Sequence, residues 1–246
     1  MLSGVVGIYY RETMVLRKKL LRVVMAAAVP PFLYLMAFGY GVGEGTSVNG
    51  VDYLTFLFPG LLAMASMNQS YNIATEINIS RFYLKIFEEF LLAPNQRWQV
   101  VAAQVLYGMT RGLIPVGVII CYSVICGVSL HYSLGFVIAL LMHLIAFSLM
   151  GFIVALKMRN HRDQASMTAF IITPMMFLSG TFFPVDQMPT IIQVVAAISP
   201  LTYSADLIRT ALLNSGDFNF MSLIILIGFN LVLCAAALHI AERVET

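Results

Sequence analysis

Residues 86–112 read IFEEFLLAPNQRWQVVAAQVLYGMTRG, and this polar interruption of an apolar chain decides the fold. Two adjacent acids, Glu88 and Glu89, stand among phenylalanine and leucine residues, a pattern that predicts a short amphipathic helix. The helix should end at Ala93, because a proline disfavours the α conformation of the residue before it. A new apolar run starts near Val100. We therefore expect residues 81–98 to lie across a membrane surface between two spans and to present apolar and acidic groups to a docking partner.

The composition of the whole chain indicates an integral membrane protein. Of the 246 residues, 60% are hydrophobic and 11% are charged, and the mean hydropathy is +0.87, whereas a soluble domain has about 25% charged residues. Apolar runs of about 20 residues predict helices rather than the alternating strands of a barrel. Cys121, Cys126 and Cys234 lie inside apolar runs and the four histidines are scattered, so we expect no disulfide and no metal site. The net charge of +2 is no signal for nucleic acid, and no such partner is expected.

Six helical spans are expected in a single transmembrane domain over residues 1–246, so the predicted fold class is an all-α integral membrane protein. The spans are placed at about 21–41, 54–75, 100–126, 134–156, 165–182 and 220–240. Before the first span, apolar residues recur at spacings of three and four, while Arg11 and Lys18 fall largely on the other side. Residues 1–20 are therefore predicted to form an interfacial amphipathic helix that continues into the first span, with a disordered tail as the alternative. Pro30 and Pro31 should kink that span.

The positions of the basic residues predict the orientation of the chain. With the N-terminus inside, 12 of the 14 lysines and arginines lie in the cytoplasm, as the positive-inside rule requires. Arg111 then falls inside a span and Arg209 on the outer side. Both termini are expected in the cytoplasm.

Several polar side chains interrupt the spans. Asn68, Asn72 and Glu76 are spaced by four and share a helix face, which either lines a conduit or supplies hydrogen bonds between helices. Arg111 is costly inside a span unless it is paired or reaches the interface; it could pair with Glu76 or snorkel toward the cytoplasm. His143 is predicted to be a hydrogen-bonded histidine of the bundle rather than a proton carrier.

Residues 183–210 form neither a full span nor an ordinary loop. A moderately apolar run leads to Ser199–Pro200, where we expect a break between two short helices. Such a pair would make a re-entrant hairpin that dips partway into the outer leaflet. On its second half Asp206 and Arg209 are three residues apart, a spacing at which the two side chains can form an ion pair. We expect them to hold the hairpin at the level of the lipid headgroups, with an incidental surface pair as the alternative.

The chain lacks the motifs of several membrane machines. No Walker motif G-x-x-x-x-G-K-[ST] is present, so nucleotide binding by that route is not expected. The G-x-S-G motif of an intramembrane serine protease is missing too, since Phe177 occupies its first glycine position. A coupled carrier should hold acids at its midplane, whereas the predicted spans hold only Glu76, near a span end. A pathway without an energy source implies an energising partner, and Glu88–Glu89 is where we expect it to dock.

Five short motifs, in order along the chain, carry a family resemblance. They are FPGLL (Phe58–Leu62), EEFLLAP (Glu88–Pro94), RG (Arg111–Gly112), LSGTFFP (Leu178–Pro184) and SPLTYSADLIR (Ser199–Arg209). Each motif is weak by itself, but together on six spans they are specific. Over nearly its whole length the chain resembles the permease subunits of ABC-2 type ATP-binding-cassette exporters, in particular the group of nodulation lipo-oligosaccharide and daunorubicin-type drug export permeases.

The resemblance implies a permease, not an enzyme, in the bacterial cytoplasmic (inner) membrane. Two permease chains, as a homodimer or a close heterodimer, would pair with two copies of a separate ABC ATPase subunit that binds ATP and Mg²⁺, and no cofactor is expected in this chain. Surrounded by membrane lipid, the complex would move an amphipathic, lipid-linked or drug-like substrate out of the cytoplasm or inner leaflet by alternating access. A membrane scaffold or assembly subunit without transport of its own, and a secondary carrier, are the alternative functions.

The expected sites follow from these assignments. The coupling helix that contacts the ATPase would comprise Phe87, Glu88, Glu89, Leu91, Leu92, Ala93 and Pro94. The interfacial helix would contribute Arg11, Arg17 and Lys18. The candidates for the pathway are Asn68, Asn72, Glu76 and Arg111. The candidates for an outer gate are Phe182, Phe183, Pro184, Pro200, Tyr203, Asp206 and Arg209.

Overall fold

A computed structural model describes residues 3–41, 43, 45–48, 50–86, 96–158, 160–214 and 219–243. The predicted coupling helix, from Phe87 to Pro94, lies outside the described residues.

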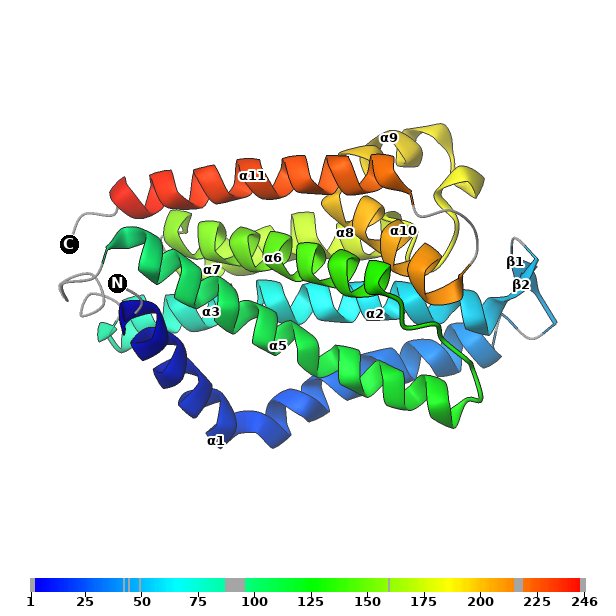
Figure 1. Cartoon of the computed structure of the whole chain (residues 1–246), viewed down its shortest axis with the longest axis horizontal. Helices are drawn as coiled ribbons and strands as arrows, with labels where there is room; N and C mark the ends of the chain where they lie inside the picture. Colours follow the sequence, from blue (N-terminus) through cyan, green and yellow to red (C-terminus); the bar gives the residue numbers. More distant parts are fainter. Residues whose placement is uncertain are drawn as a thin grey trace.

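The described chain is almost entirely helical, as predicted (Figure 1). Its first half comprises α1 (Ser3–Tyr34), the π-helical turn η1 (Leu35–Tyr40), the strands β1 (Ser47–Val48) and β2 (Val51–Asp52), α2 (Tyr53–Tyr71), α3 (Ile73–Asn78) and η2 (Ile79–Tyr83). The second half comprises α5 (Arg97–Ile125), α6 (Leu134–Lys157), α7 (His161–Met167), η3 (Thr168–Ile172), α8 (Thr173–Leu178), η4 (Val185–Gln187), α9 (Thr190–Ile198), α10 (Pro200–Leu213) and α11 (Phe220–Arg243).

The long helices run side by side along one axis (Figure 1). The two chain ends lie together at one end of this bundle, which we call the terminal end. The antiparallel pair β1–β2 and the helix pair α9–α10 lie at the opposite end, which we call the hairpin end.

Helix α2 is the centre of the bundle. All but three of its 19 residues are buried, and it packs against α5, α6 and α10. A helix that is apolar nearly all round is stable only when other elements cover it on every side. The sequence around Phe58–Leu62, which is apolar without a polar face, therefore dictates this central position.

Within the part of the chain that the structure describes, four helices are long and apolar enough to cross a membrane, namely Ser3–Tyr40, Arg97–Ile125, Leu134–Lys157 and Phe220–Arg243. The bent pair α9–α10 would make a fifth if it counts as one span. The predicted spans 54–75 and 165–182 are helical, but neither contains a helix that is both long enough and apolar enough to cross a membrane by the same standard. Helix α2 ends in polar residues such as Asn68 and Gln69, and the other segment is divided among α7, η3 and α8. A multi-pass membrane protein is confirmed, and the count of six spans stays a prediction.

The predicted interfacial helix and first span form one helix, because α1 continues without interruption from Ser3 through Pro30 and Pro31 to Tyr34. Figure 1 shows that this helix bends, so that its first half leans away from the bundle axis. The exposed fractions are high for Arg17 and Lys18 in this first half. A helix whose start leans off the bundle with basic side chains outward is compatible with the predicted interfacial position.

The break predicted at Ser199–Pro200 is confirmed. Helices α9 and α10 meet there at 89°. The residue before the proline is extended, with φ −81° and ψ 124°, as the proline ring requires. The hydroxyl of Ser199 accepts a hydrogen bond from the amide of Leu201 at 3.2 Å, and Pro200 begins α10 at the position where a missing N–H costs nothing.

Gly60 in the middle of α2 permits the closest approach between two segments far apart in the sequence. A Cβ atom at this position would lie 2.0 Å from the carbonyl oxygen of Thr181, and no real Cβ reaches that distance to a backbone atom. The turn that contains Thr181 can therefore sit directly on the α2 backbone only because residue 60 is glycine.

We predict that Gly60→Ala lowers the free energy of unfolding by at least about 1–3 kcal/mol, because the backbone of the turn must move to relieve the clash. The matched control is Gly117→Ala on α5, where nothing lies within 4 Å of the added Cβ. That change should be neutral or stabilising by up to about 1 kcal/mol through helix propensity. Thermal unfolding of the detergent-purified variants measures both, and equal midpoints for the two variants would contradict the close packing.

Candidate functional site

The turn Ser179–Pro184 is the irregular backbone segment around which the hairpin end is built. It follows α8, and Gly180 takes a left-handed conformation with φ +79°. Arg209 on α10 donates a hydrogen bond from Nη2 to the Gly180 carbonyl at 2.7 Å, and Tyr53 at the start of α2 donates from its hydroxyl to the Phe182 carbonyl at 3.1 Å. Side chains from two separate helices thus satisfy carbonyls that no helix or sheet satisfies.

The guanidinium of Arg209 is also held by an aromatic ring. Its Cζ lies 4.0 Å from the centroid of the Phe56 ring, the distance of a cation–π contact. The motif regions FPGLL, LSGTFFP and SPLTYSADLIR therefore meet in space: Gly60 of the first touches Thr181 of the second, and Arg209 of the third bonds to Gly180 of the second.

Asp206 and Arg209 form no ion pair with each other in the part of the chain that the structure describes, although their spacing permits one. Asp206 instead accepts hydrogen bonds at Oδ2 from Ser222 at 2.9 Å and from Asn219 at 3.0 Å, both at the start of α11. The spacing of three allows a pair on an isolated helix. In the folded chain, buried carbonyls on one side and the α11 terminus on the other compete for the two side chains.

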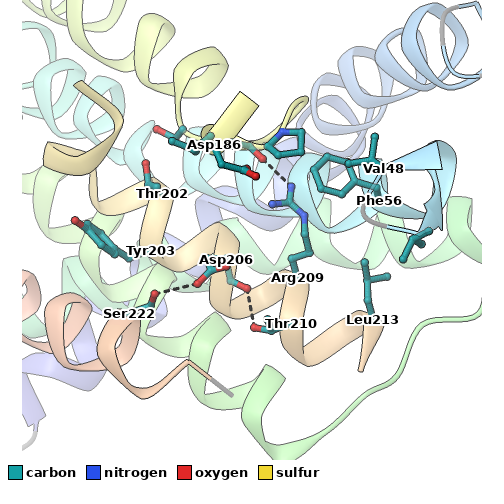
Figure 2. A pocket seen from close by; sticks show the side chains of 15 residues that line it. Val48, Phe56, Asp186, Thr202, Tyr203, Asp206, Arg209, Thr210, Leu213 and Ser222 are labelled. Atoms are coloured by element: carbon teal, nitrogen blue, oxygen red, sulfur yellow. Dashed lines mark hydrogen bonds between the residues drawn. The ribbon is translucent and has the colours of Figure 1, made fainter. Parts of the chain in front are cut away.

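A cavity of about 520 Å³ opens beside Arg209 (Figure 2). Its polar lining includes Asp186, Thr202, Asp206 and Ser222 in addition to the arginine. We call this cavity the chamber. Its volume falls within the range of about 300–1,000 Å³ that is typical of small-molecule sites.

The other candidates for an outer gate take different positions. Phe182 is buried and packs against aromatic rings of α1, η1 and α8, with ring centroids 5.3 Å from Tyr34, 4.9 Å from Phe38 and 5.4 Å from Phe177. Phe183 is exposed. Pro184 and Tyr203 line the chamber, whereas Pro200 is buried at the start of α10.

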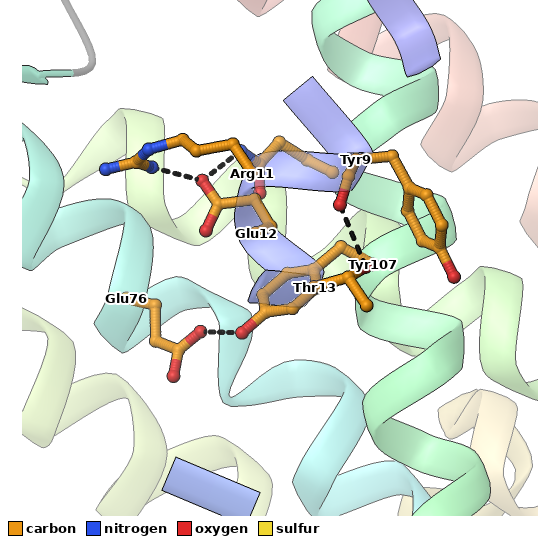
Figure 3. Close-up of polar contacts among 7 residues, drawn as sticks. Tyr9, Arg11, Glu12, Thr13, Glu76 and Tyr107 are labelled. Carbon is orange, nitrogen blue, oxygen red and sulfur yellow. Dashed lines mark hydrogen bonds and ion pairs between the residues drawn. The ribbon is translucent and has the colours of Figure 1, made fainter. Parts of the chain in front are cut away.

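A second polar cluster joins α2, α3 and α5 toward the terminal end, and Figure 3 shows the hydrogen bond between Tyr107 and Glu76 in it. Nη1 of Arg111 lies 2.9 Å from Oε1 of Glu76, so the arginine is paired rather than snorkelling. Its Nη2 donates to Gln69 at 3.0 Å, and the hydroxyl of Tyr107 donates to Glu76. Pairing and hydrogen bonding are what a charge inside a span requires, and they fasten α2 and α3 to α5.

The predicted polar face of α2 divides into two parts. Glu76 supplies the interhelical bonds described above. Asn72, between the end of α2 and the start of α3, donates to Asn68 on α2 at 3.4 Å, and both side chains are partly exposed. Only the part near Glu76 therefore acts as hydrogen-bonding glue between helices.

Sequence reasoning missed Glu12. Its side chain is buried, pairs with Arg11 at 2.7 Å and lies 3.5 Å from the amide of Gln104 on α5. A signal was present in the sequence. Glu12 follows Val5 and Ile8 at helical spacing, and these residues share the face that α1 buries.

His143 on α6 is a hydrogen-bonded histidine of the bundle, as predicted. It is fully buried, and its Nε2 lies 3.0 Å from the hydroxyl of Ser66 on α2 while its Nδ1 lies 2.8 Å from the hydroxyl of Ser204 on α10. One imidazole therefore links three helices.

The segments on either side of residues 87–95 are firmly attached to the bundle. Arg81 donates from Nη1 to the carbonyls of Ala155 at 2.7 Å and Leu156 at 3.2 Å, which belong to the last turn of α6. Burial lowers the pKa of Arg81 from its ordinary value, but an arginine stays protonated in proteins. On the other side, the Gln99 side chain accepts from the Gln96 amide at 2.9 Å and caps α5.

The described residues contain no group of three or more histidine, cysteine or acidic side chains that could hold a metal ion. The three cysteines are free thiols, and Cys121 and Cys234 are exposed on the outside of the bundle.

Comparison with known proteins gives a consistent result. The family model described as ABC-2 type transporter matches residues 6–213. The inner membrane transport permease YadH of Escherichia coli K12 is 27% identical over 207 residues, which cover 81% of this chain and 80% of YadH. Nodulation protein J of Rhizobium leguminosarum bv. viciae is 28% identical over 213 residues, covering 84% of this chain and 81% of that protein. Nodulation protein J of Rhizobium meliloti is 29% identical over 216 residues, with 85% and 81% covered.

We predict that Arg209→Ala lowers the free energy of unfolding by about 1–3 kcal/mol, because the buried Gly180 carbonyl loses its donor. Arg209→Lys should recover part of this loss, since lysine keeps the charge but lacks the planar group that stacks on Phe56. Arg243→Ala, at an exposed position near the end of α11, is the control for loss of an arginine. Thermal unfolding of the purified chain provides the measurement. If Arg209→Ala unfolded at the same temperature as Arg243→Ala, the anchoring role would be refuted.

Proposed function

Since the chain belongs to the ABC-2 type transporter family, we propose that it is the membrane-spanning permease subunit of an ATP-driven exporter. Its cargo is an amphipathic, lipid-linked or drug-like molecule that leaves the cytoplasm or the inner leaflet. The observation that carries this proposal is the convergence of three motif regions on the turn Ser179–Pro184, which fixes the hairpin end of the bundle. The similarity to an inner membrane transport permease supports the bacterial inner membrane as its location.

We propose six spans with both termini in the cytoplasm. The six segments are α1–η1, α2–α3, α5, α6, α7–η3–α8 and α11, and the re-entrant pair α9–α10 precedes the last of them. This topology is supported by the positions of the termini, which lie together at the terminal end (Figure 1). It is also supported by the basic residues of the N-terminal helix and of the segments before α5 and α7, which belong to that end.

The energising partner in this proposal is an ABC ATPase subunit, present in two copies, which binds ATP and Mg²⁺. It docks on the coupling helix Phe87–Pro94, with Arg11, Arg17 and Lys18 of α1 nearby. The attachment of the flanking segments supports this role. Because Arg81 is bonded to the end of α6 and the Gln96 amide is bonded to the Gln99 side chain of α5, a push on the residues between them would be transmitted to two long helices.

The pathway in this proposal runs along the polar face of α2, at the interface with a second permease chain. Asn68 and Asn72 are partly exposed on an otherwise buried helix, and side chains of this kind inside a membrane must face protein or water. Two hollows border them, one lined by Pro31, Met176 and Asn68, the other by Gln164, Thr168 and Asn72. A homodimer would cover this face and enclose the cargo between two copies.

The orientation can be tested with single cysteines in a variant in which Cys121, Cys126 and Cys234 are replaced by serine. Ser47 in β1 and Arg162 in α7 are exposed and belong to opposite ends of the bundle. We expect Ser47→Cys to react with a membrane-impermeant maleimide in intact cells, and Arg162→Cys to react only after permeabilisation. The opposite pattern would reverse the topology.

The docking of the ATPase can be tested by reversing the two acids of the coupling helix. We expect Glu88→Lys with Glu89→Lys to abolish the stimulation of ATP hydrolysis by cargo, because apolar anchors seat a helix in a groove while charges set its register. The permease should still fold and insert.

The measurement uses the complete permease–ATPase complex in reconstituted vesicles, with basal and stimulated hydrolysis compared. The control is Glu242→Lys, which reverses an exposed acid near the end of α11 and should leave stimulation unchanged. A stimulated rate at the wild-type level in the double variant would end the coupling-helix assignment.

A further inference from the structure

A cluster of basic side chains lies in the middle of α1. It comprises Arg17, Lys18, Lys19 and Arg22, whose side chains are all exposed. Residues 13–43 contain no aspartate or glutamate. The ion pairs among the described residues are formed by other arginines, so no acidic side chain in this part of the chain neutralises the cluster. Its positive charge can therefore attract an anion from the surroundings.

A hollow of about 520 Å³ lies beside this cluster, and we call it the basic hollow. It is lined by Lys18, Lys19, Leu21, Arg22 and Met25. Positions 18, 21, 22 and 25 share one face of a helix, because they follow one another at helical spacing. The exposed fractions of Leu21 and Met25 are 77% and 55%. In the described part of the chain all lining residues belong to α1, so the hollow presents cations and apolar side chains to the surroundings of the bundle.

The length of α1 places the basic hollow at the membrane surface. The helix Ser3–Tyr40 has 38 residues and would be about 57 Å long if it were straight, whereas the hydrocarbon core of a bilayer is about 30 Å thick. A large part of this helix therefore lies outside the hydrocarbon. Arg22 is the last charged residue of α1, and the stretch from Arg22 to Tyr40 is about 27 Å long. Arg22 thus lies at the level of the lipid headgroups, and Met25 lies where the hydrocarbon begins.

We propose that the basic hollow binds an anionic phospholipid. The phosphate lies among the ammonium groups of Lys18 and Lys19 and the guanidinium of Arg22, whose planar fork matches the geometry of phosphate oxygens. One acyl chain follows Leu21 and Met25 into the hydrocarbon. A zwitterionic lipid carries its own cation close to its phosphate, whereas the hollow holds cations alone. The site therefore selects lipids with a net negative charge.

The chemistry of this face fits a phospholipid better than a protein partner. A second copy of the chain that docked through the same face would bring two sets of cations together, which charge repulsion opposes. Of the residues of α1 proposed above to lie near the ATPase, Arg11 and Arg17 do not line the hollow. A phospholipid supplies both the phosphate and the apolar chain that the hollow can hold. The inference goes beyond the proposed function, because lipid binding needs neither cargo nor ATPase.

The test is native mass spectrometry of the purified full chain with dioleoyl phosphatidylglycerol or dioleoyl phosphatidylcholine at equal concentrations. We expect phosphatidylglycerol to bind at least about tenfold more tightly. An excess of inorganic phosphate should leave it bound, because phosphate alone makes no contact with Leu21 and Met25. Equal binding of the two lipids, or displacement by phosphate, would overturn the proposal. This comparison uses the wild-type chain, so it does not depend on the folding of any variant.

Variants of α1 localise the bound lipid. Lys18→Gln with Lys19→Gln and Arg22→Gln should weaken the binding of phosphatidylglycerol at least about tenfold and leave that of phosphatidylcholine unchanged. Lys18→Arg with Lys19→Arg keeps the charge of the hollow and should bind phosphatidylglycerol as the wild type does. Circular dichroism and thermal unfolding in detergent establish that both variants are folded. Wild-type affinity in the glutamine variant would refute the site.

The matched control removes three exposed basic residues from other helices of the terminal end, as Lys157→Gln with Arg162→Gln and Arg243→Gln. These residues belong to α6, α7 and α11 and do not line the basic hollow, so the control should bind phosphatidylglycerol as tightly as the wild type. An equal loss of affinity in the two glutamine variants would show attraction to overall charge and overturn the proposal. A crosslink from Lys18 to a second copy of the chain in place of bound lipid would also overturn it.

Discussion

The hydrogen bond from Arg209 to the Gly180 carbonyl, made over the face of Phe56, is the interaction on which the hairpin end depends. An irregular turn inside an apolar bundle exposes carbonyls that neither water nor a helix satisfies, and such backbone persists only where protein groups bond to it. Arg209 and Tyr53 meet this need from two sides. Once the turn is held, Thr181 can rest on Gly60, and α10 is fixed against the start of α2.

The same rule governs the terminal end, where the charge inside the bundle is never alone. Arg111 is paired with Glu76 and bonded to Gln69, and Tyr107 completes the set. Arg111 is the buried partner and Glu76 is partly exposed, so loss of Glu76 would leave the arginine charge in an apolar surrounding. The helices α2, α3 and α5 are thus fastened by a contact that resists partial separation. Such a contact suits a group of helices that moves as one rigid body when a partner protein pushes on it.

The limits of sequence-based prediction follow from the kind of interaction involved. Apolar run length and proline position are local properties, so the helices at 100–126, 134–156 and 220–240 and the break at Ser199–Pro200 were predictable. The contact of Gly60 with Thr181 joins residues more than a hundred positions apart and leaves no local trace. Helical spacing permits an Asp206–Arg209 pair but takes no account of competing partners, and Asp206 bonds to Ser222 and Asn219 instead. Glu12 could have been found from its place on the buried face of α1, whereas the coupling helix lies outside the described residues and stays a prediction.

The two arms of the bent pair differ in how they are secured. Helix α10 buries eight of its fourteen residues and is tied by Ser204 to His143 and by Arg209 to the turn, while α9 buries only Ala196. Releasing α10 would strand an imidazole nitrogen and a carbonyl in the core, each at a cost of about 1–3 kcal/mol. Releasing α9 would disrupt far fewer buried contacts. Any opening at the 89° break would therefore be a rotation of α9 relative to a stationary α10. The hydrogen bond between the hydroxyls of Ser179 and Ser199 would hold the closed position.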